Sequence, residues 1–175
     1  MIISVEKVKE LIDIPEKWTD EKLSMKLKAI EQTIRKYTNN NFQDVDFRRT
    51  ADIVGSLFVV EAITPFSIGD TVQISESELN KGLFVVASAD DSTFTVEESV
   101  NDEGNVLVTK IVYPDDVIDC ALNLLEWNIK HRGKIGVKSE TLSRHSVTYE
   151  DSSSMFNGYP KGILNAVDLY RKARF

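Results

Sequence analysis

The side chains of this chain that could take part in chemistry are few and scattered. His131 and His145 are the only histidines, and neither has a second His or a Cys at the spacing of metal ligands. A single cysteine, Cys120, excludes an internal disulfide and a thiolate cluster for zinc. We therefore predict no metal site and no cofactor, with the two histidines at a helix end and in a loop.

Three pairs of acidic residues are the next candidates. All three lie in or beside turns between apolar runs: Asp90-Asp91, Glu97-Glu98 and Asp102-Glu103. Their spacing does not match a calcium loop, and the chain has no phosphate loop, no GxGxxG and no GxSxG motif. We interpret the pairs as solvated turn residues and predict no catalytic residue and no enzymatic activity.

A basic segment is the remaining candidate site. Its cations are opposed by a single acid, Glu140, and Gly133 and Gly136 lie among them. The cations are Lys130, Arg132, Lys134, Lys138 and Arg144. This pattern predicts a flexible strand or hairpin that approaches a polyanion, and a solvated loop is the alternative.

The net charge of −7 is unevenly distributed along the 175 residues. Residues 46–112 carry 12 acidic and 4 basic side chains, a net −8, whereas the rest carries 16 and 17, a net +1. The acidic segment contains the run GDTVQI, which is typical of SH3-like barrels that bind nucleic acid. Because its charge would repel phosphate, we favour a scaffolding or partner-docking role for it.

The elements that must position these residues are helices on both sides of the acidic segment. Apolar residues recur at intervals of four and three in the second of them: Leu23, Leu27, Ile30, Ile34 and Tyr37. Ser4 and Thr19 are predicted to cap the first two helices, and Asn39 to end the second. A third helix is expected from Pro114 to Arg132, with Cys120 as a buried apolar filler, and a fourth over residues 163–174.

Within the acidic segment the period changes to that of strands. Five short runs rich in Val, Ile, Phe and Thr are separated by turns: LFVVEA, TVQIS, LFVVASA, STFTVEE and NVLVTKIV. The predicted fold is therefore α+β, a small bundle of about four helices with an inserted antiparallel β-barrel or sandwich. The expected domains are a helical domain, residues 1–45 with 113–175, and a β-module, residues 46–112.

The N-terminus, MIISVEKVKE, has no basic segment followed by an apolar run. No stretch approaches the roughly 18 apolar residues of a membrane span. A soluble protein without a signal peptide and without a membrane partner is expected.

The C-terminal third resembles a known family. The helix from Pro114 to Arg132, the run KIGVKSETLSRHSVTYED and the ending GYPKGILNAVDLYRKARF are similar to the C-terminal half of phage head-to-tail connector proteins. The resemblance covers residues 1–45 and 113–175, and the β-module departs from the simplest members. It implies a structural protein at the virion neck, assembled in the cytoplasm of the bacterial host.

The resemblance also implies partners and site residues. Subunits of this family form a homo-oligomeric ring, expected to be twelve-fold, between the portal protein and tail-side neck proteins, a stopper or a tail terminator. A loop after the third helix would face the channel through which packaged DNA passes, and it would contain Lys134, Lys138, Arg144 and His145. The C-terminal tail would dock on the portal through Tyr170, Arg171, Lys172, Arg174 and Phe175.

Two other classes of protein stay open on the sequence. A nucleic-acid-binding regulatory or adaptor protein would use the basic segment as its reader, although the acidic β-module counts against it. A small hydrolase is disfavoured because the catalytic motifs named above are missing. Binding of linear DNA by the lone protein would favour the regulator, and capture by purified portal would favour the connector.

Overall fold

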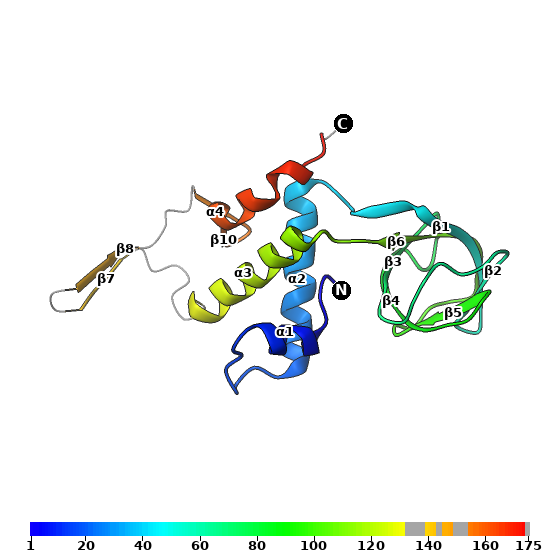
Figure 1. The fold of residues 1–175 in the computed structure, drawn as a ribbon, viewed down its shortest axis with the longest axis horizontal. Coiled ribbons are helices and arrows are strands. Elements are labelled where there is room, and N and C mark those ends of the chain that lie inside the picture. Colours follow the sequence, from blue (N-terminus) through cyan, green and yellow to red (C-terminus); the bar gives the residue numbers. More distant parts are fainter. Residues whose placement is uncertain (132–138, 143–144, 149–153, 174–175) are drawn as a thin grey trace. The chain divides into compact units, whose positions relative to one another are not determined.

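The computed structural model describes residues 1–131, 139–142, 145–148 and 154–173. The chain divides into two compact units. The barrel unit comprises Met1 with Asn41–Tyr113, and the helical unit comprises Ile2–Asn40 with Pro114–Phe175. The predicted α+β class is confirmed, with helices in one unit and a closed antiparallel β-barrel in the other (Figure 1).

Six strands form the barrel, in the order β1-β2-β5-β4-β3-β6, and β6 pairs back with β1. Their bounds are β1 Gln43–Val54, β2 Leu57–Val60, β3 Thr71–Ser75, β4 Gly82–Ala89, β5 Thr93–Val96 and β6 Glu103–Ile111. The five runs expected from the sequence are all strands, and the barrel alternative replaces the sandwich. Closure leaves the barrel without a free edge strand.

Strand β1 was missed by the sequence analysis. It is rich in charged residues, and of its 12 residues only Ala51 and Ile53 are buried. Irregular register between Asp44 and Arg48 and again after Ala51 lets this long strand curve and pair with both β2 and β6. Alternation of apolar and polar residues is therefore weak in β1, although the strand closes the barrel.

Aromatic rings fill the barrel interior. Phe58 and Phe94 stack with ring centroids 4.5 Å apart, and Phe66 meets Phe94 edge-on at 5.1 Å. All three are at most 5% exposed. This aromatic core belongs to the barrel unit alone.

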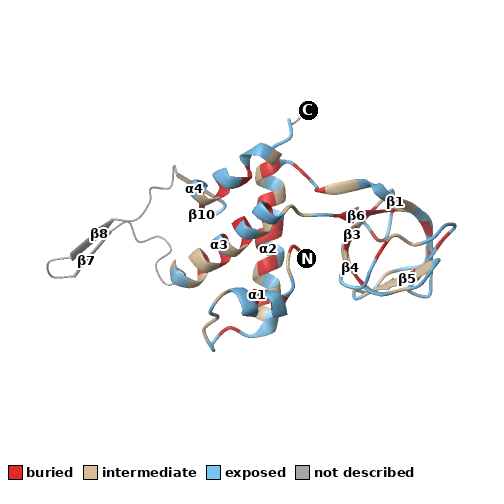
Figure 2. Ribbon diagram, viewed as in Figure 1, coloured by how far each residue is buried: buried red, intermediate tan, exposed pale blue. Residues whose placement is uncertain are grey.

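The helical unit contains α1 Val5–Leu11, α2 Asp20–Thr38, α3 Asp115–His131 and α4 Lys161–Leu164, followed by a 3₁₀ helix, η3 Asn165–Tyr170. Two short hairpins, β7 Ser139–Leu142 with β8 His145–Thr148 and β9 Met155–Phe156 with β10 Tyr159–Pro160, complete it. Buried residues line the inner sides of α2 and α3 (Figure 2). The helix expected over residues 163–174 is wrong in type and extent, because helical structure there ends at Tyr170.

Helix ends follow the expected chemistry. The Ser4 and Thr19 hydroxyls accept hydrogen bonds from the amides of Lys7 and Lys22, at 3.3 and 3.4 Å. Asn39 ends α2 with a left-handed backbone, φ 49°. In the described part of the chain, no helix has both the length and the apolar character needed to cross a membrane.

Candidate docking surfaces

The C-terminal segment, residues 170–173, is fixed to the end of α2. The amide of Lys172 donates to the carbonyl oxygen of Thr38 at 2.8 Å, and the Asn39 side chain donates to the carbonyl oxygen of Ala173 at 2.9 Å. These bonds use the free carbonyl of a helix end and the cap side chain beside it. The segment leaves the helical conformation because its backbone pairs with α2 instead of with itself.

A cluster of three side chains strengthens this attachment. The Tyr37 hydroxyl donates to a carboxylate oxygen of Asp168 at 2.8 Å, and Arg171 lies over the Tyr37 ring, 5.2 Å from its centroid. Arg171 also lies 3.6 Å from Asp168. Desolvation, followed by the hydrogen bond to Asp168, raises the pKa of Tyr37.

Tyr170 makes a second attachment, to the first turn of α3. Its hydroxyl lies 2.9 Å from both carboxylate oxygens of Asp116. The hydrogen bond to Asp116 is the main cause of the raised pKa of Tyr170. Tyr170 is therefore partly buried and attached to the helical unit rather than projecting from it.

The five residues predicted to dock on the portal thus fall into three groups. Tyr170 anchors the tail, while Arg171 and Lys172 are exposed cations at its surface. Arg174 and Phe175 lie outside the described residues. The structure brings Arg171 and Lys172 together at one end of the helical unit, beside the end of α2.

The predicted channel loop is only partly described. Lys134, Lys138 and Arg144 lie outside the described residues, and His145 is the first residue of β8. The backbone there forms an antiparallel hairpin in which His145 pairs with Leu142.

His131 ends α3 and packs against its own helix. Its ring stacks on Trp127 at 5.0 Å and 17°, and its Nδ1 lies 2.9 Å from the Trp127 carbonyl oxygen. Both line a cleft of about 460 Å³ beside α4. Among the described residues no three His, Cys, Asp or Glu side chains gather to hold a metal ion.

Cys120 is the buried filler that the sequence predicts. It is 1% exposed, and its Sγ donates to the Ile163 carbonyl oxygen at 3.6 Å. Burial is the main cause that raises the pKa of this thiol to about 11, so it is a poor nucleophile.

Glu103 corrects the interpretation of the acidic pairs as solvated turn residues. Its carboxylate accepts hydrogen bonds from the Ser77 hydroxyl and the Glu78 amide, both at 2.6 Å, and from the Asn80 side chain at 2.8 Å. The bond from Ser77 is the largest cause of the lowered pKa of Glu103. Glu103 thus holds the β3–β4 loop in place, because donors of that loop converge on its partly exposed carboxylate.

Two more members of these pairs also bind backbone amides. Asp102 accepts from the Gly55 amide at 2.7 Å, and Glu98 accepts from the Val85 amide at 3.1 Å. Sequence reasoning missed these roles because the donors, in the β1–β2 turn and in strand β4, are distant along the chain. By contrast, Asp90 and Asp91 are exposed, as the sequence predicts.

The charge difference between the units follows from these positions. Residues 41–113 carry 13 acidic and 4 basic side chains, a net −9, and the remaining residues carry 15 and 17, a net +2. Long-range electrostatics therefore favour basic partners for the barrel unit and oppose its contact with nucleic acid.

Comparison with known proteins identifies the family. The comparison with curated proteins found no match. A family model described as head completion protein matches residues 1–173, which includes both units. Members of this phage family are structural, and the family places the protein at the neck of the virion, where portal and tail components meet. The chain belongs to the head completion protein family.

Proposed function

We propose that this protein forms a closed ring between the portal and the tail, extends the DNA channel and provides the platform for tail attachment. The observation that carries the proposal is the family match over residues 1–173. Identical subunits joined through two different surfaces close into rings when the rotation between them allows it. The twelve-fold symmetry and assembly in the host cytoplasm are part of the proposal.

The end of the helical unit near α2 supports a portal-docking role. Arg171 and Lys172 are exposed there, and their backbone is already held by α2. A prearranged binding segment gives up less conformational entropy on docking than a free tail does. Arg174 and Phe175 follow directly and add a cation and an aromatic ring, both favoured at interfaces.

Packaged DNA is proposed to pass the basic segment and not the barrel. Lys134, Lys138, Arg144 and His145 would line the channel, where phosphate contacts are independent of sequence and weakened by salt. The net −9 of the barrel unit supports this assignment, because that unit repels phosphate. Tail-side neck proteins, a stopper or a tail terminator, are the proposed partners on the other side of the ring.

Capture by purified portal protein tests the docking surface. A variant that combines Lys172→Ala with removal of residues 174–175 keeps Tyr170 and the bonds of the backbone to α2. We expect it to lose about 1 to 4 kcal/mol of binding free energy for each anchor removed, because interface cations and aromatics contribute on that scale. Lys130→Ala is the matched control, since Lys130 is an exposed cation of the same unit, paired with Glu126.

The outcomes separate the alternatives. Unchanged capture by the tail variant would remove the C-terminal residues from the docking surface. Lys134→Ala with Lys138→Ala should spare capture and change only DNA retention or ejection. Tight, salt-sensitive binding of linear DNA by the lone protein, without capture by portal, would instead support a nucleic-acid-binding regulator.

A further inference from the structure

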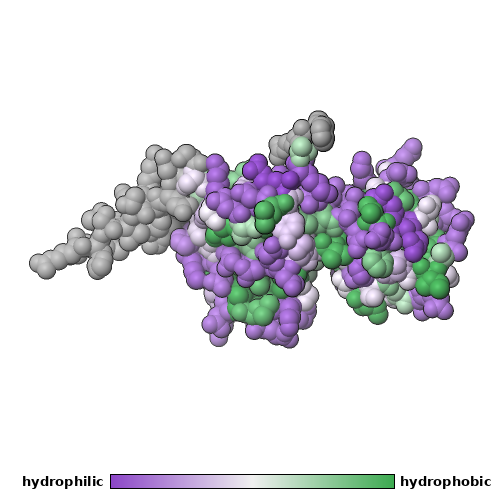
Figure 3. Space-filling model, turned by 45° about the horizontal axis from the view of Figure 1, so that its top comes forward, coloured by the Kyte–Doolittle hydropathy of each residue, from purple (hydrophilic) through white to green (hydrophobic). Residues whose placement is uncertain are grey.

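An exposed apolar strip runs along the outside of β2 and beyond its end. Leu57, Val59 and Ile63 are 38%, 42% and 77% exposed, and Glu61 lies between the last two. Leu57 and Val59 alternate with buried residues of β2 and face outward, and Glu61 and Ile63 are exposed just after the strand, where the chain bends. These four residues are here called the β2 strip. Figure 3 shows such apolar patches among polar atoms on the barrel surface.

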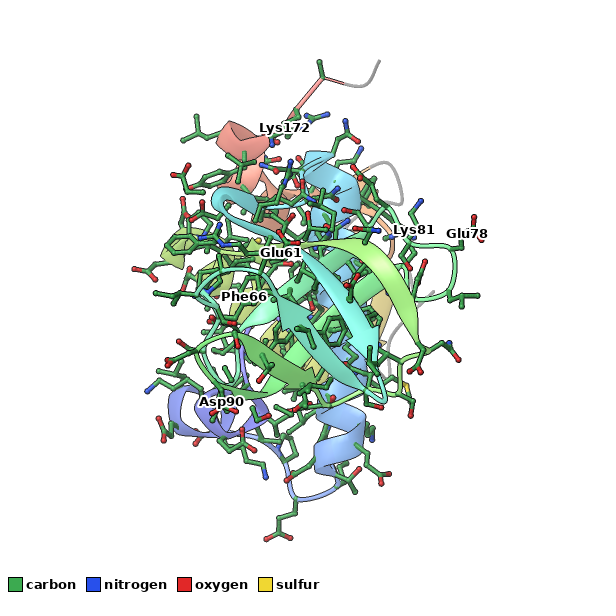
Figure 4. The ribbon with its side chains drawn as sticks, turned by 90° about the vertical axis from the view of Figure 1, so that its right-hand side faces the viewer. Glu61, Phe66, Glu78, Lys81, Asp90 and Lys172 are labelled. Atoms are coloured by element: carbon green, nitrogen blue, oxygen red, sulfur yellow. The ribbon has the colours of Figure 1, made fainter. Side chains whose placement is uncertain are left out.

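A cleft of about 530 Å³ adjoins the strip at Ile63. Its lining combines apolar atoms, two carboxylates and two hydroxyls: Ile63, Thr64, Phe66, Ala89, Asp90, Asp91 and Ser92. Backbone bonds hold it in shape, since the Thr64 amide donates to the Asp91 carbonyl oxygen at 2.7 Å. In the end-on view of Figure 4, Asp90 lies across the barrel from Glu78 and Lys81 of the β3–β4 loop.

The two carboxylates of the cleft favour a cationic partner. The Thr64 hydroxyl oxygen nearby is buried and has no hydrogen-bond partner in the described structure. The carboxylates of Asp90 and Asp91 are exposed beside it. A lysine side chain fits this chemistry, with its aliphatic stem on Ile63 and its ammonium group near the acids.

The complementary surface lies on α2 of the same protein. Its outer stripe is exposed over three turns and is here called the α2 stripe: Met25, Lys28, Ala29, Gln32 and Lys36. Met25 is 72% exposed. Between Lys22 and Thr38 the helix carries five cations and one acid, Glu31, which is buried. An apolar residue among lysines is the electrostatic complement of Ile63 beside two aspartates.

We propose that the α2 stripe of one copy docks on the β2 strip and cleft of the next copy. The two surfaces are similar in extent, since Met25 to Lys36 spans about 16 Å at the rise of a helix and Leu57 to Ile63 at most about 20 Å, the length of a fully extended chain. A closed barrel offers faces and no free edge, so strand addition is not an option. The contact joins two different surfaces, which is the geometry that builds rings. This inference rests on the proposed ring and names its subunit contact.

Cysteine crosslinking between separately prepared copies tests the contact. Full-length Met25→Cys is mixed with full-length Ile63→Cys under mild oxidation, and the native Cys120 does not compete because it is 1% exposed. Leu169→Cys and Ile68→Cys, at positions 93% and 72% exposed, are the matched controls for the two units. We expect disulfides between 25 and 63 at protein concentrations up to about 1 mM, at a yield about tenfold above the control pairs, as about 1.4 kcal/mol of preference gives.

Charge reversal provides the second arm. Asp90→Lys with Asp91→Lys in the Ile63→Cys copy should lower the yield about tenfold, because like charges then face each other. Lys28→Glu with Lys36→Glu in the Met25→Cys copy should restore it. A yield no higher than the controls, or one unaffected by charge reversal, overturns the proposed contact.

Failure of the contact and failure of the proposed function are distinguishable. If crosslinking fails while a neck ring of this protein is seen in particles, only the contact is wrong. If particles join without the protein, the proposed function is wrong.

Discussion

In the barrel unit three phenylalanine rings, two stacked and one edge-on, fill the interior. The helical unit instead combines a buried apolar face of α2 with a C-terminal segment held by hydrogen bonds. The barrel closes on itself, and its loops are held by its own carboxylates. The helical unit ends in exposed cations. In the contacts proposed above, the barrel unit contributes the β2 strip, and the helical unit contributes the α2 stripe and its C-terminal segment.

Removing the barrel tests whether the helical unit folds without it. The amide of Val112 donates to the Phe42 carbonyl oxygen at 3.0 Å, so the two ends of the barrel lie side by side. Replacing residues 43–111 with a short Gly/Ser linker should leave a helical protein that unfolds cooperatively. Urea unfolding followed by tryptophan fluorescence reports on it, since Trp18 and Trp127 both belong to the helical unit. Gradual, non-cooperative unfolding would show that the units depend on each other.

A single core substitution in each unit tests whether the two units unfold independently. Phe94→Ala should destabilise the barrel by about 3 to 5 kcal/mol, and Leu124→Ala should destabilise the helical unit by about 2 to 5 kcal/mol, because both leave cavities at sites at most 1% exposed. Phe94→Ala is expected to leave the tryptophan fluorescence transition in urea unchanged, whereas Leu124→Ala shifts it to lower urea. Equal shifts of that transition in both variants would contradict independent units.

The attachment of the tail should be sensitive to one side chain. Asn39→Gly keeps the left-handed backbone but removes the bond to Ala173, at a cost of about 1 kcal/mol. Amide hydrogen exchange in residues 170–173 should therefore become faster. Asn157→Gly is the matched control, because Asn157 also has positive φ, at 51°. Unchanged exchange in Asn39→Gly would mean that the Asn39 side chain is not needed to hold the tail.

The smallest expected effect is a pH dependence of the barrel. The folded pKa of Glu103 lies below its ordinary value of 4.5. Its carboxylate therefore stabilises the barrel above that value, and the stabilisation is lost as the pH falls through the folded pKa. In Glu103→Gln the stability, followed by far-UV circular dichroism, should fall less as the pH is lowered into the acid range. Glu97→Gln serves as the control. An identical acid profile for wild type and Glu103→Gln would remove Glu103 from this role.

The sequence predicted the elements whose signals are local. The caps at Ser4 and Thr19, the buried leucines and isoleucines of α2, and the five apolar strands depend on neighbouring residues. Strand β1 and the extended residues after Tyr170 depend on pairing with distant segments, so no local pattern marks them. The contacts of Glu103 with the β3–β4 loop were not predicted for the same reason. A carboxylate beside a turn is interpreted as solvated when its donors are 23 to 26 residues away along the chain.

The candidate docking residues were predicted by resemblance more than by pattern. Exposed Arg171 and Lys172 could be named from the ending of the chain, but the anchoring of Tyr170 on Asp116 could not, because those residues are 54 positions apart. The cleft at Ile63 has no sequence signal either, since it forms from two loops of the closed barrel.

Imaging the neck of the virion tests the central claim most directly. Particles carrying this protein with a bound antibody fragment should show the label as one ring between the portal vertex and the tail, and particles made without the protein should be filled or leaking heads beside free tails. A label on the head shell or along the tail tube, or joined infectious particles in the absence of the protein, would contradict the account.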